Sequence, residues 1–157
     1  MRVGIGYDVH SLAPGRRLVL GGIEIPFDKG LGGWSDADVL THAIIDALLG
    51  AAALGDIGSH FPPGEPEYKD ISSLVLLKRV RDKLAENGWK VNNVDAIILA
   101  ERPKLRDFID QMRQQLSQTL GIHISQVSVK ASTSDQLGFI GRGEGIATYA
   151  AATVEEK

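Results

Sequence analysis

The sequence contains no cysteine among its 157 residues, so disulfides and thiolate metal sites are both excluded. Any metal site must therefore use histidine, aspartate or glutamate. The net charge of −3 gives no indication of a basic surface that would bind nucleic acid. No uncharged apolar run reaches the length of a membrane span, and the start of the chain is too short and polar for a signal peptide. We therefore expect a cytoplasmic protein with neither nucleic acid nor membrane as a partner.

Hydrophobic residues make up 43% of the chain and charged residues 24%, as in ordinary globular domains. The length predicts one domain covering residues 1–157. Glycine is abundant, with 18 residues, and it clusters in a few stretches, which is typical of tight turns and of backbone that approaches a neighbour closely. In particular, glycines at positions 4 and 6 of a predicted strand indicate that side chains there would crowd another part of the molecule.

Strands and helices are mixed without strict alternation, which favours an α+β fold. We expect two layers, a mixed sheet of about four main strands with helices on one face. The predicted strands are 2–10, 94–100, 127–131 and 146–154, with a hairpin of 17–20 and 23–26 around Gly21-Gly22. The predicted helices run from a Ser35/Asp38 capping box to a stop at Gly55, over 71–87 with Asp70 as the cap, and over 105–120 with Gly121 as the stop. Residues 28–33, 56–66 and 132–145 are expected loops, and 155–157 a frayed tail.

Potential metal ligands occur in two of these elements. Asp8 and His10 are two apart on a strand, so both side chains point to one side; a polar strand end explains this pair equally well. Asp38, His42 and Asp46 are four apart and share one side of a helix. For the helix taken alone, a solvated polar face with a surface histidine is the better interpretation.

Three segments contain most of the candidate catalytic and ligand-binding residues: Gly6–His10, Ser35–Val39 followed by His42, and Lys130–Gly145 (KASTSDQLGFIGRGEG). Together with Gly55–Gly58, Phe61-Pro62 and Arg102–Lys104, they resemble the 2-C-methyl-D-erythritol 2,4-cyclodiphosphate synthase family. The resemblance runs from Met1 to about Val154. Each motif alone is weak, but their occurrence together and in order is highly specific.

The resemblance implies an enzyme of the non-mevalonate isoprenoid pathway. Its reaction cyclises 4-diphosphocytidyl-2-C-methyl-D-erythritol 2-phosphate to the 2,4-cyclodiphosphate and releases CMP, because the 2-phosphate attacks the β-phosphorus. The resemblance also implies a homotrimer with active sites between neighbouring subunits. A hydrophobic cavity on the three-fold axis is implied too, with an isoprenoid diphosphate as a further partner there.

For the metals, the resemblance implies Zn²⁺ held by Asp8, His10 and His42, a set that leaves a fourth position for a phosphate oxygen. It implies Mg²⁺ or Mn²⁺ between the α- and β-phosphates, held by the carboxylate at position 135. The resemblance further implies that the Thr133 hydroxyl contacts phosphate. From spacing alone, Asp38 or Asp46 is a candidate to orient His42.

The implied substrate-binding set falls into three groups. Asp56 and Gly58 match the groups that hold the erythritol hydroxyls, and residues 61–65 border that pocket. The cytidine pocket matches residues 100–106 with Ala131 and Ser132. In full, the set is Asp8, Val9, His10, Trp34, Ser35, Asp56, Ile57, Gly58, Phe61, Pro62, Pro63, Gly64, Glu65, Ala100, Glu101, Arg102, Pro103, Lys104, Leu105, Arg106, Ala131, Ser132, Thr133, Ser134, Asp135, Phe139 and Arg142.

Two catalytic positions depart from the family pattern. Asp135 stands where glutamate is usual, so its carboxylate is one methylene shorter, and a bridging water is an alternative to direct coordination. Trp34 stands where a phosphate-contacting histidine is common; an indole N–H contact and a packing role at a subunit boundary have equal weight. His60 matches no motif position and is interpreted as a loop histidine, and His123, which follows a helix stop, is expected to be exposed. For Arg142 and Glu144, an interface ion pair is favoured over a diphosphate contact.

Two other functions fit part of this pattern. A trimeric metal- or isoprenoid-binding module would keep Asp8, His10 and His42, but it would not need Thr133, Lys104 or a second-metal carboxylate. A metal-dependent phosphohydrolase would use the same ligands and release inorganic phosphate in place of CMP.

Overall fold

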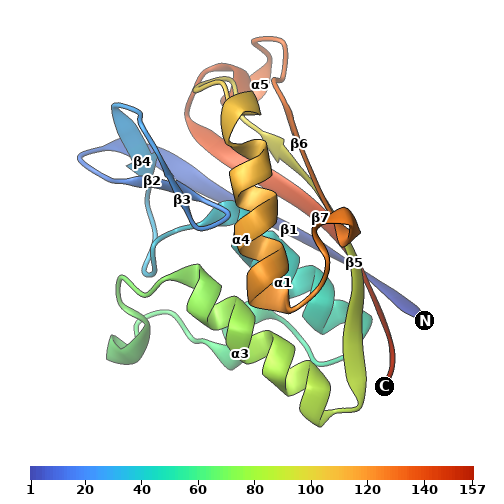
Figure 1. The fold of residues 1–157 in the computed structure, drawn as a ribbon. Helices are drawn as coiled ribbons and strands as arrows, with labels where there is room; N and C mark the ends of the chain where they lie inside the picture. The colour runs from blue at the N-terminus through green and yellow to red at the C-terminus, as the bar shows by residue number, and fades with distance from the viewer.

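The computed structural model describes all 157 residues. A five-stranded mixed sheet with the order β4-β1-β7-β5-β6 carries the long helices α1, α3 and α4 on one face (Figure 1). A separate two-stranded hairpin, β2-β3, lies beside this sheet. The expected α+β class and mixed sheet are confirmed. The elements are β1 (Arg2–Pro14), β2 (Leu18–Leu20), β3 (Ile23–Ile25), β4 (Lys29–Leu31), α1 (Val39–Ala51), α2 (Ile57–His60), η1 (Pro66–Tyr68), α3 (Ser73–Glu86), β5 (Trp89–Leu99), η2 (Arg106–Phe108), α4 (Ile109–Leu120), η3 (Ile124–Gln126), β6 (Val127–Ser132), α5 (Gly138–Gly141) and β7 (Gly145–Glu156).

The middle of the sheet is formed by β1 and β7, the first and last strands of the chain. β1 and β7 pair antiparallel from Arg2 opposite Val154 to Ser11 opposite Gly145, and β7 pairs antiparallel with β5. β5 and β6 are parallel. The connection through α4 is long enough to return the chain to the end of the sheet at which β5 begins. The short strand β4, in a region expected to be a loop, adds to the edge of β1.

Helix α1 is buried on almost every side and forms the centre of the helical layer. It lies directly on β1, and glycines make this approach possible. A Cβ atom at Gly6 would lie 2.9 Å from the carbonyl carbon of Ala43 and from the amide nitrogen of Ala47. Gly4 approaches the Ala47 carbonyl and Ala51 in the same way. The predicted crowding at positions 4 and 6 is thus confirmed, and its source is the backbone of α1.

The start of α1 differs from the prediction. Its N-cap is Asp38, whose carboxylate accepts a hydrogen bond from the Thr41 amide, so the expected capping box with Ser35 as the cap is wrong. The same carboxylate accepts the amide hydrogens of Gly21 and Gly22, at 2.9 and 2.8 Å. Asp38 therefore joins the turn of the β2-β3 hairpin to the start of the helix, a long-range contact that local spacing does not indicate.

Three other predicted ends are also wrong. Helix α1 stops at Ala51 rather than at Gly55. Helix α3 begins at Ser73, and the carboxylate of Asp36, rather than that of Asp70, accepts its first amide hydrogen at 3.0 Å. The tail is not frayed, because β7 continues to Glu156 and the Lys157 amide donates to the Gly88 carbonyl. The stop at Gly121 is confirmed by its left-handed conformation.

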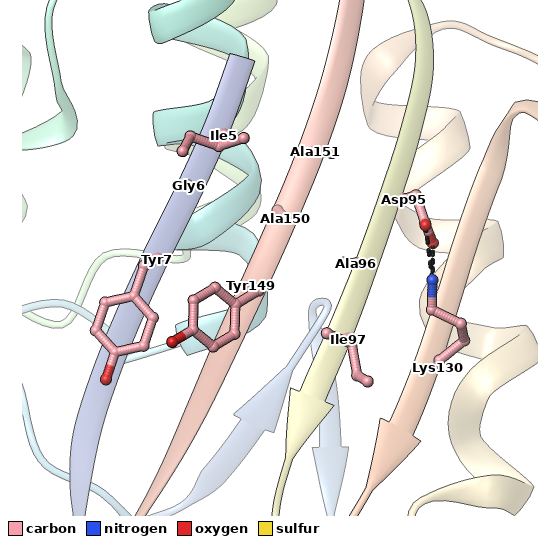
Figure 2. Close-up of a pocket in the computed structure, with 10 residues that line it drawn as sticks. All are labelled: Ile5, Gly6, Tyr7, Asp95, Ala96, Ile97, Lys130, Tyr149, Ala150 and Ala151. Carbon is pink, nitrogen blue, oxygen red and sulfur yellow. Dashed lines mark hydrogen bonds and ion pairs between the residues drawn. The ribbon is translucent and has the colours of Figure 1, made fainter. Parts of the chain in front are cut away.

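The sheet face turned away from the helices is open. Along β1, glycines on the helix side alternate with apolar side chains that are exposed on this face. Tyr7 of β1 and Tyr149 of β7 lie side by side there, with ring centroids 4.8 Å apart (Figure 2). Val3 and Ile5 are 68% and 82% exposed. No helix is both long and apolar enough to cross a membrane.

Candidate active site

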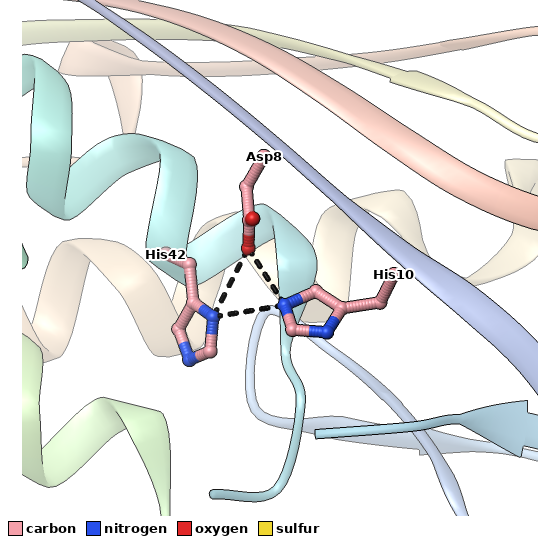
Figure 3. Close-up of side chains that lie close together, drawn as sticks. All are labelled: Asp8, His10 and His42. Carbon is pink, nitrogen blue, oxygen red and sulfur yellow. Dashed lines mark hydrogen bonds and ion pairs between the residues drawn. The ribbon is translucent and has the colours of Figure 1, made fainter. Parts of the chain in front are cut away.

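Asp8, His10 and His42 converge where β1 crosses α1 (Figure 3). Asp8 Oδ2 lies 2.8 Å from His10 Nε2 and 3.1 Å from His42 Nδ1, and the two nitrogens are 3.3 Å apart. Ligand atoms around a tetrahedral zinc ion, at bonds of about 2.0–2.1 Å, are separated by roughly 3.3 Å. The three atoms thus already have nearly the spacing of three corners of a zinc tetrahedron.

The electrostatics of this triad favour a positive charge at its centre. Burial raises the pKa of Asp8, but hydrogen bonds and charge from His10 and His42 outweigh burial and bring that pKa to about 2. Burial lowers the pKa of His10, but Asp8 and the Gly32 carbonyl outweigh it, so the pKa is raised. The His10 Nδ1 atom lies 2.7 Å from the Gly32 carbonyl oxygen. Because a carbonyl only accepts, neutral His10 keeps its proton on Nδ1 and turns the Nε2 lone pair to the triad.

The other polar residues of α1 do not orient His42, contrary to the spacing argument. Asp38 is fully buried in its capping role, and burial together with the charge of Asp36 raises its pKa. Asp46 accepts the Ile57 amide hydrogen at 2.7 Å, and burial raises its pKa as well. The interpretation as a solvated polar face is therefore also wrong, because α1 lies inside the molecule.

A pocket of about 230 Å³ opens beside the triad. Its floor includes the triad itself and helix α2, whose N-cap is Asp56; a hydrogen bond from Ser59 lowers the pKa of Asp56. Most lining residues belong to the predicted substrate set, whereas Tyr68 and Leu76 were not predicted. The lining residues are Asp8, His10, Trp34, Ser35, His42, Ile57, Gly58, Phe61, Pro63, Tyr68 and Leu76.

Trp34 lines this pocket with its ring, but its N–H is already engaged. The indole nitrogen donates to the Glu65 carbonyl at 2.9 Å, and the Lys69 ammonium lies 6.0 Å from the ring centre. Trp34 thus fixes the loop that carries residues 61–65. This geometry favours the packing role over a phosphate contact through the indole N–H.

A second pocket, of about 470 Å³, lies at the ends of β5 and β6. It collects most of the predicted cytidine set and adds Asp107; its lining is Ala100, Glu101, Pro103, Lys104, Leu105, Arg106, Asp107, Ala131, Ser132 and Thr133. The Glu101 carboxylate accepts the amide hydrogens of Ser134 and Gln136, both at 3.2 Å. Glu101 therefore holds the loop that carries Thr133 and Asp135.

The two pockets share no lining residue. Asp8 is on β1 and Ser132 is on β6, and β7 and β5 lie between them in the sheet. Three strand spacings amount to about 14 Å. A single chain thus keeps the triad and the second pocket apart.

The remaining predicted residues lie outside both pockets. Arg142 forms an ion pair with Glu144 at 2.8 Å within the same chain, and both side chains are exposed. His60 is half-buried at the end of α2 rather than in a loop, and it contacts the Leu54 carbonyl. His123 is exposed as the cap of η3, as expected. Val9, Asp56, Pro62, Gly64, Glu65, Arg102, Ser134, Asp135, Phe139 and Arg142 line neither pocket.

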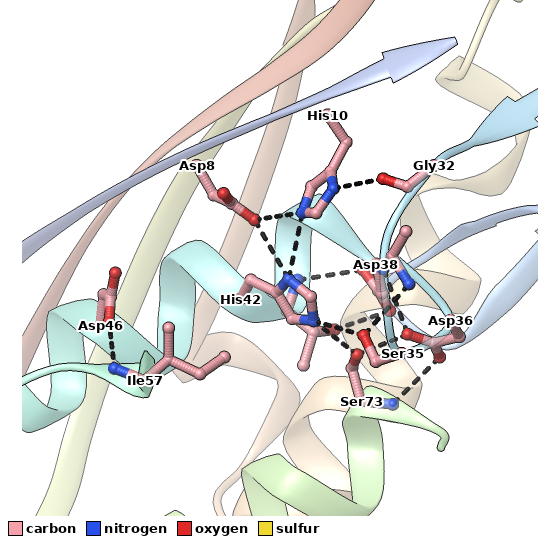
Figure 4. A network of polar contacts seen from close by, with 12 residues as sticks. Asp8, His10, Gly32, Ser35, Asp36, Asp38, His42, Asp46, Ile57 and Ser73 are labelled. Atoms are coloured by element: carbon pink, nitrogen blue, oxygen red, sulfur yellow. Dashed lines mark hydrogen bonds and ion pairs between the residues drawn. The ribbon is translucent and has the colours of Figure 1, made fainter. Parts of the chain in front are cut away.

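Sequence reasoning missed the contacts behind His42, although Ser35 belongs to the predicted substrate set. The Nε2 atom of His42 faces the hydroxyl oxygens of Ser73 at 2.8 Å and Ser35 at 3.2 Å, and Ser73 contacts the carboxylate of Asp36 (Figure 4). Asp36 lies inside the predicted Ser35–Val39 motif and so carried some signal. Ser73 carried none, since it reaches the site from a helix that starts 31 positions after His42.

Comparisons with known proteins agree over the whole chain. The YgbB family model matches residues 1–155. The chain is 64% identical to the 2-C-methyl-D-erythritol 2,4-cyclodiphosphate synthase of Dehalococcoides mccartyi strain CBDB1, over 100% of both chains. It is 59% identical to the synthase of Desulforamulus reducens, over 99% of each chain.

Solved structures give the same result. The bifunctional IspDF from Campylobacter jejuni superposes with a TM-score of 0.96 at 40% identity, covering 99% of this chain and 42% of that one. The CDP complex of IspF from Plasmodium falciparum gives a TM-score of 0.87 at 31% identity, covering 99% of this chain and 96% of that one. The protein described here belongs to the YgbB family, the family of the 2-C-methyl-D-erythritol 2,4-cyclodiphosphate synthases.

Proposed function

We propose that the protein converts 4-diphosphocytidyl-2-C-methyl-D-erythritol 2-phosphate to 2-C-methyl-D-erythritol 2,4-cyclodiphosphate and releases CMP. The observation that carries the proposal is the convergence of Asp8, His10 and His42 beside a pocket, in a chain that is 64% identical to a named synthase over its full length. The reaction joins two anionic groups of one substrate, so it depends on charge neutralisation and alignment.

Asp8, His10 and His42 are proposed to hold Zn²⁺, since their ligand atoms have tetrahedral spacing. When bound there, zinc polarises a phosphate oxygen and fixes its position as a Lewis acid. The chain does the rest of the positioning. The loop held by Glu101 presents the Thr133 hydroxyl to phosphate, and Trp34 and Ser35 border the pocket beside the triad.

The proposal includes a second cation, Mg²⁺ or Mn²⁺, bound chiefly by diphosphate oxygens with Asp135 as the protein carboxylate. Lys104 and the backbone of residues 100–106 are proposed to bind the cytidine end of the substrate in the larger pocket. Asp56 and Gly58 are proposed to bind the erythritol hydroxyls: Gly58 lines the smaller pocket, and Asp56 is the N-cap of the helix that carries Gly58.

We further propose a homotrimer in which the triad of one subunit faces the cytidine pocket of its neighbour. Two observations support this arrangement. The pocket beside the triad, at about 230 Å³, is smaller than the roughly 300–1,000 Å³ of complete small-molecule sites. The open sheet face also exposes apolar side chains of β1 and β7 that a neighbouring subunit can cover (Figure 2).

An isoprenoid diphosphate in the three-fold cavity remains part of this proposal, with Arg142 as its anion contact. The ion pair between Arg142 and Glu144 in one chain favours the ion-pair role as the main one. Calorimetric titration of the trimer with an isoprenoid diphosphate, with Arg142→Ala as the comparison, separates the two roles.

The activity is tested with His42→Ala, and His123→Ala is the matched control because that histidine is exposed and far along the chain. We expect His42→Ala to lose zinc and CMP release while it stays folded and keeps its assembly, and the control to behave as wild type. An active, zinc-replete His42→Ala protein would refute the ligand assignment. Release of inorganic phosphate by the wild type would indicate a phosphohydrolase, and zinc binding without turnover a binding module.

The shared site is tested by subunit mixing. His42→Ala and Lys104→Ala chains are each expected to be nearly inactive. Refolded together in equal amounts, they place an intact triad opposite an intact cytidine pocket at about a quarter of the interfaces. We expect CMP release to recover to a comparable fraction. Verified mixed trimers without recovery would mean that each subunit carries its whole site.

A further inference from the structure

A buried chain of hydrogen bonds lies behind the triad. His42 Nε2 is 2.8 Å from Ser73 Oγ, and Ser73 Oγ makes a short hydrogen bond to the Asp36 carboxylate (Figure 4). The same carboxylate accepts the Ser73 amide hydrogen at 3.0 Å. Ser73 is fully buried and His42 is only 9% exposed. Water therefore does not compete with these contacts.

The chemistry of the three groups fixes where the protons lie. An ionised carboxylate only accepts hydrogen bonds, so the Ser73 hydroxyl donates its single proton to Asp36. The Ser73 oxygen then faces His42 Nε2 with a lone pair, and the contact at 2.8 Å requires the proton on Nε2. Neutral imidazole carries one N–H. The competing acceptor is Asp8 Oδ2, which lies 3.1 Å from His42 Nδ1. The shorter contact with Ser73 favours the proton on Nε2 and leaves the Nδ1 lone pair on the side of Asp8 and His10.

We propose that Ser73 and Asp36 are positioning residues that hold His42 in its Nε2–H tautomer, so that Nδ1 is available as a metal ligand. The inference rests on the proposed zinc site and deepens it. Groups that receive the second N–H of a ligating histidine fix its ring and increase its basicity. Gly32 does this for His10 through a backbone carbonyl; Ser73 and Asp36 do it for His42 through side chains, which can be substituted.

Ser35 is a weaker partner of the same nitrogen. Its oxygen is 3.2 Å from His42 Nε2 and also accepts the Ala37 amide hydrogen at 3.2 Å. In the absence of Ser73, the proton of Ser35 is free to turn to Nε2, which would move the imidazole proton to Nδ1 and block the ligand atom. Loss of the Ser73 hydroxyl is thus expected to change the tautomer as well as to remove a contact.

The test uses Ser73→Ala, which removes the hydroxyl but keeps the backbone N–H that Asp36 accepts at the start of α3. Ser72→Ala is the matched control on the same turn, because Ser72 is exposed and makes no side-chain cap bond. Ser117→Ala controls for the loss of a buried serine elsewhere. The readouts are zinc affinity by competition with a chromophoric chelator, and the His42 tautomer in zinc-free protein by ¹⁵N NMR of labelled histidines.

We expect the Nε2–H tautomer in the wild type and a shift toward Nδ1–H in Ser73→Ala. Zinc affinity should fall by about tenfold or more in Ser73→Ala and stay unchanged in both controls. Asp36→Asn keeps the shape of the side chain, but one of its three donors must then face an amide NH₂. We expect a loss of affinity in the same direction, which provides an independent variant if Ser73→Ala folds poorly.

The positioning role is overturned if the wild type has His42 in the Nδ1–H form. It is also overturned if Ser73→Ala keeps both the wild-type tautomer and the wild-type zinc affinity, in which case the proposed zinc site itself still stands. A wild type that binds no zinc would overturn the metal site and the positioning role together. The tautomer readout moves only if Ser73 acts on His42, whereas a purely structural role changes stability alone.

Discussion

The contact between β1 and α1 determines both the packing of the core and the spacing of the triad. Gly6 lies against the backbone of α1, two residues before Asp8, and Ala43 follows His42 directly along the helix. Replacing Gly6 by alanine would place a Cβ 2.9 Å from two backbone atoms of α1 and closer still to the Ala43 carbonyl oxygen. Backbone cannot rotate away as a flexible side chain can, so the strand and the helix must separate.

The required separation is on the order of 1 Å, and overpacking of this kind typically costs about 1–3 kcal/mol or more. The same shift moves Asp8 and His10 relative to His42, whose Nδ1 atom is now 3.1 Å from Asp8 Oδ2. Metal–ligand distances tolerate only about 0.2 Å. We therefore expect Gly6→Ala to lower the melting temperature and to weaken zinc binding by a larger factor than its loss of stability explains.

Gly50→Ala is the matched control. Gly50 lies on α1 too, but a Cβ there would meet nothing closer than the Ile5 carbonyl at 3.9 Å, and alanine favours a helix by about 1 kcal/mol. The assay is thermal unfolding with and without zinc, together with chelator competition. A Gly6→Ala protein with the melting temperature and zinc affinity of the wild type would show that the strand and the helix need not separate.

Three further predictions address individual side chains. If Asp135 serves the second cation, Asp135→Asn should strongly weaken Mg²⁺ or Mn²⁺ dependence, whereas identical metal titrations of the two proteins would exclude that role. In zinc-free protein, the pKa of Asp8, lowered from 3.8 to about 2, should contribute about 2 kcal/mol of stability above pH 4 that is lost as the pH falls toward 2; urea unfolding of wild type and Asp8→Asn should therefore converge at low pH. Trp34→Phe keeps an aromatic ring, though a smaller one, and loses the hydrogen bond to the Glu65 carbonyl. We expect kcat/KM to fall by no more than about tenfold, and a hundredfold loss would instead assign the indole N–H to the substrate.

The sequence predicts most of the fold because most elements carry local signals. β-branched runs mark β5 and β6, Gly21-Gly22 marks the hairpin turn, and Gly121 marks the end of α4. The errors fall where a distant group determines the end of an element. Asp38 caps α1 in part because the amides of Gly21 and Gly22 need its carboxylate. No spacing within the helix carries that information.

In the site, too, local sequence patterns predict some features and miss those that depend on distant residues. Asp8 and His10 are brought together by the period of a strand, and the resemblance adds His42, which the structure places beside them. Helical spacing wrongly predicts that Asp38 or Asp46, on the same helix, orients His42. The groups that contact the other ring nitrogen of His42, Nε2, come from the preceding loop and from α3. Local periodicity identifies residues on one element, whereas tertiary packing decides which elements support the site.

The aspartate at position 135 suits a backbone conformation that the sequence alone does not reveal. Asp135 has a φ angle of 52°, in the left-handed region where aspartate and asparagine are enriched several-fold over most other residues. Glutamate has no such advantage, because its longer side chain does not readily bond to the adjacent backbone. Aspartate is therefore compatible with this backbone, but it has about one methylene less reach toward the cation that is proposed to bind there. It follows that Asp135→Glu should restore reach at a small cost in loop stability, and a comparison of its Mg²⁺ dependence with its melting temperature measures the two effects separately.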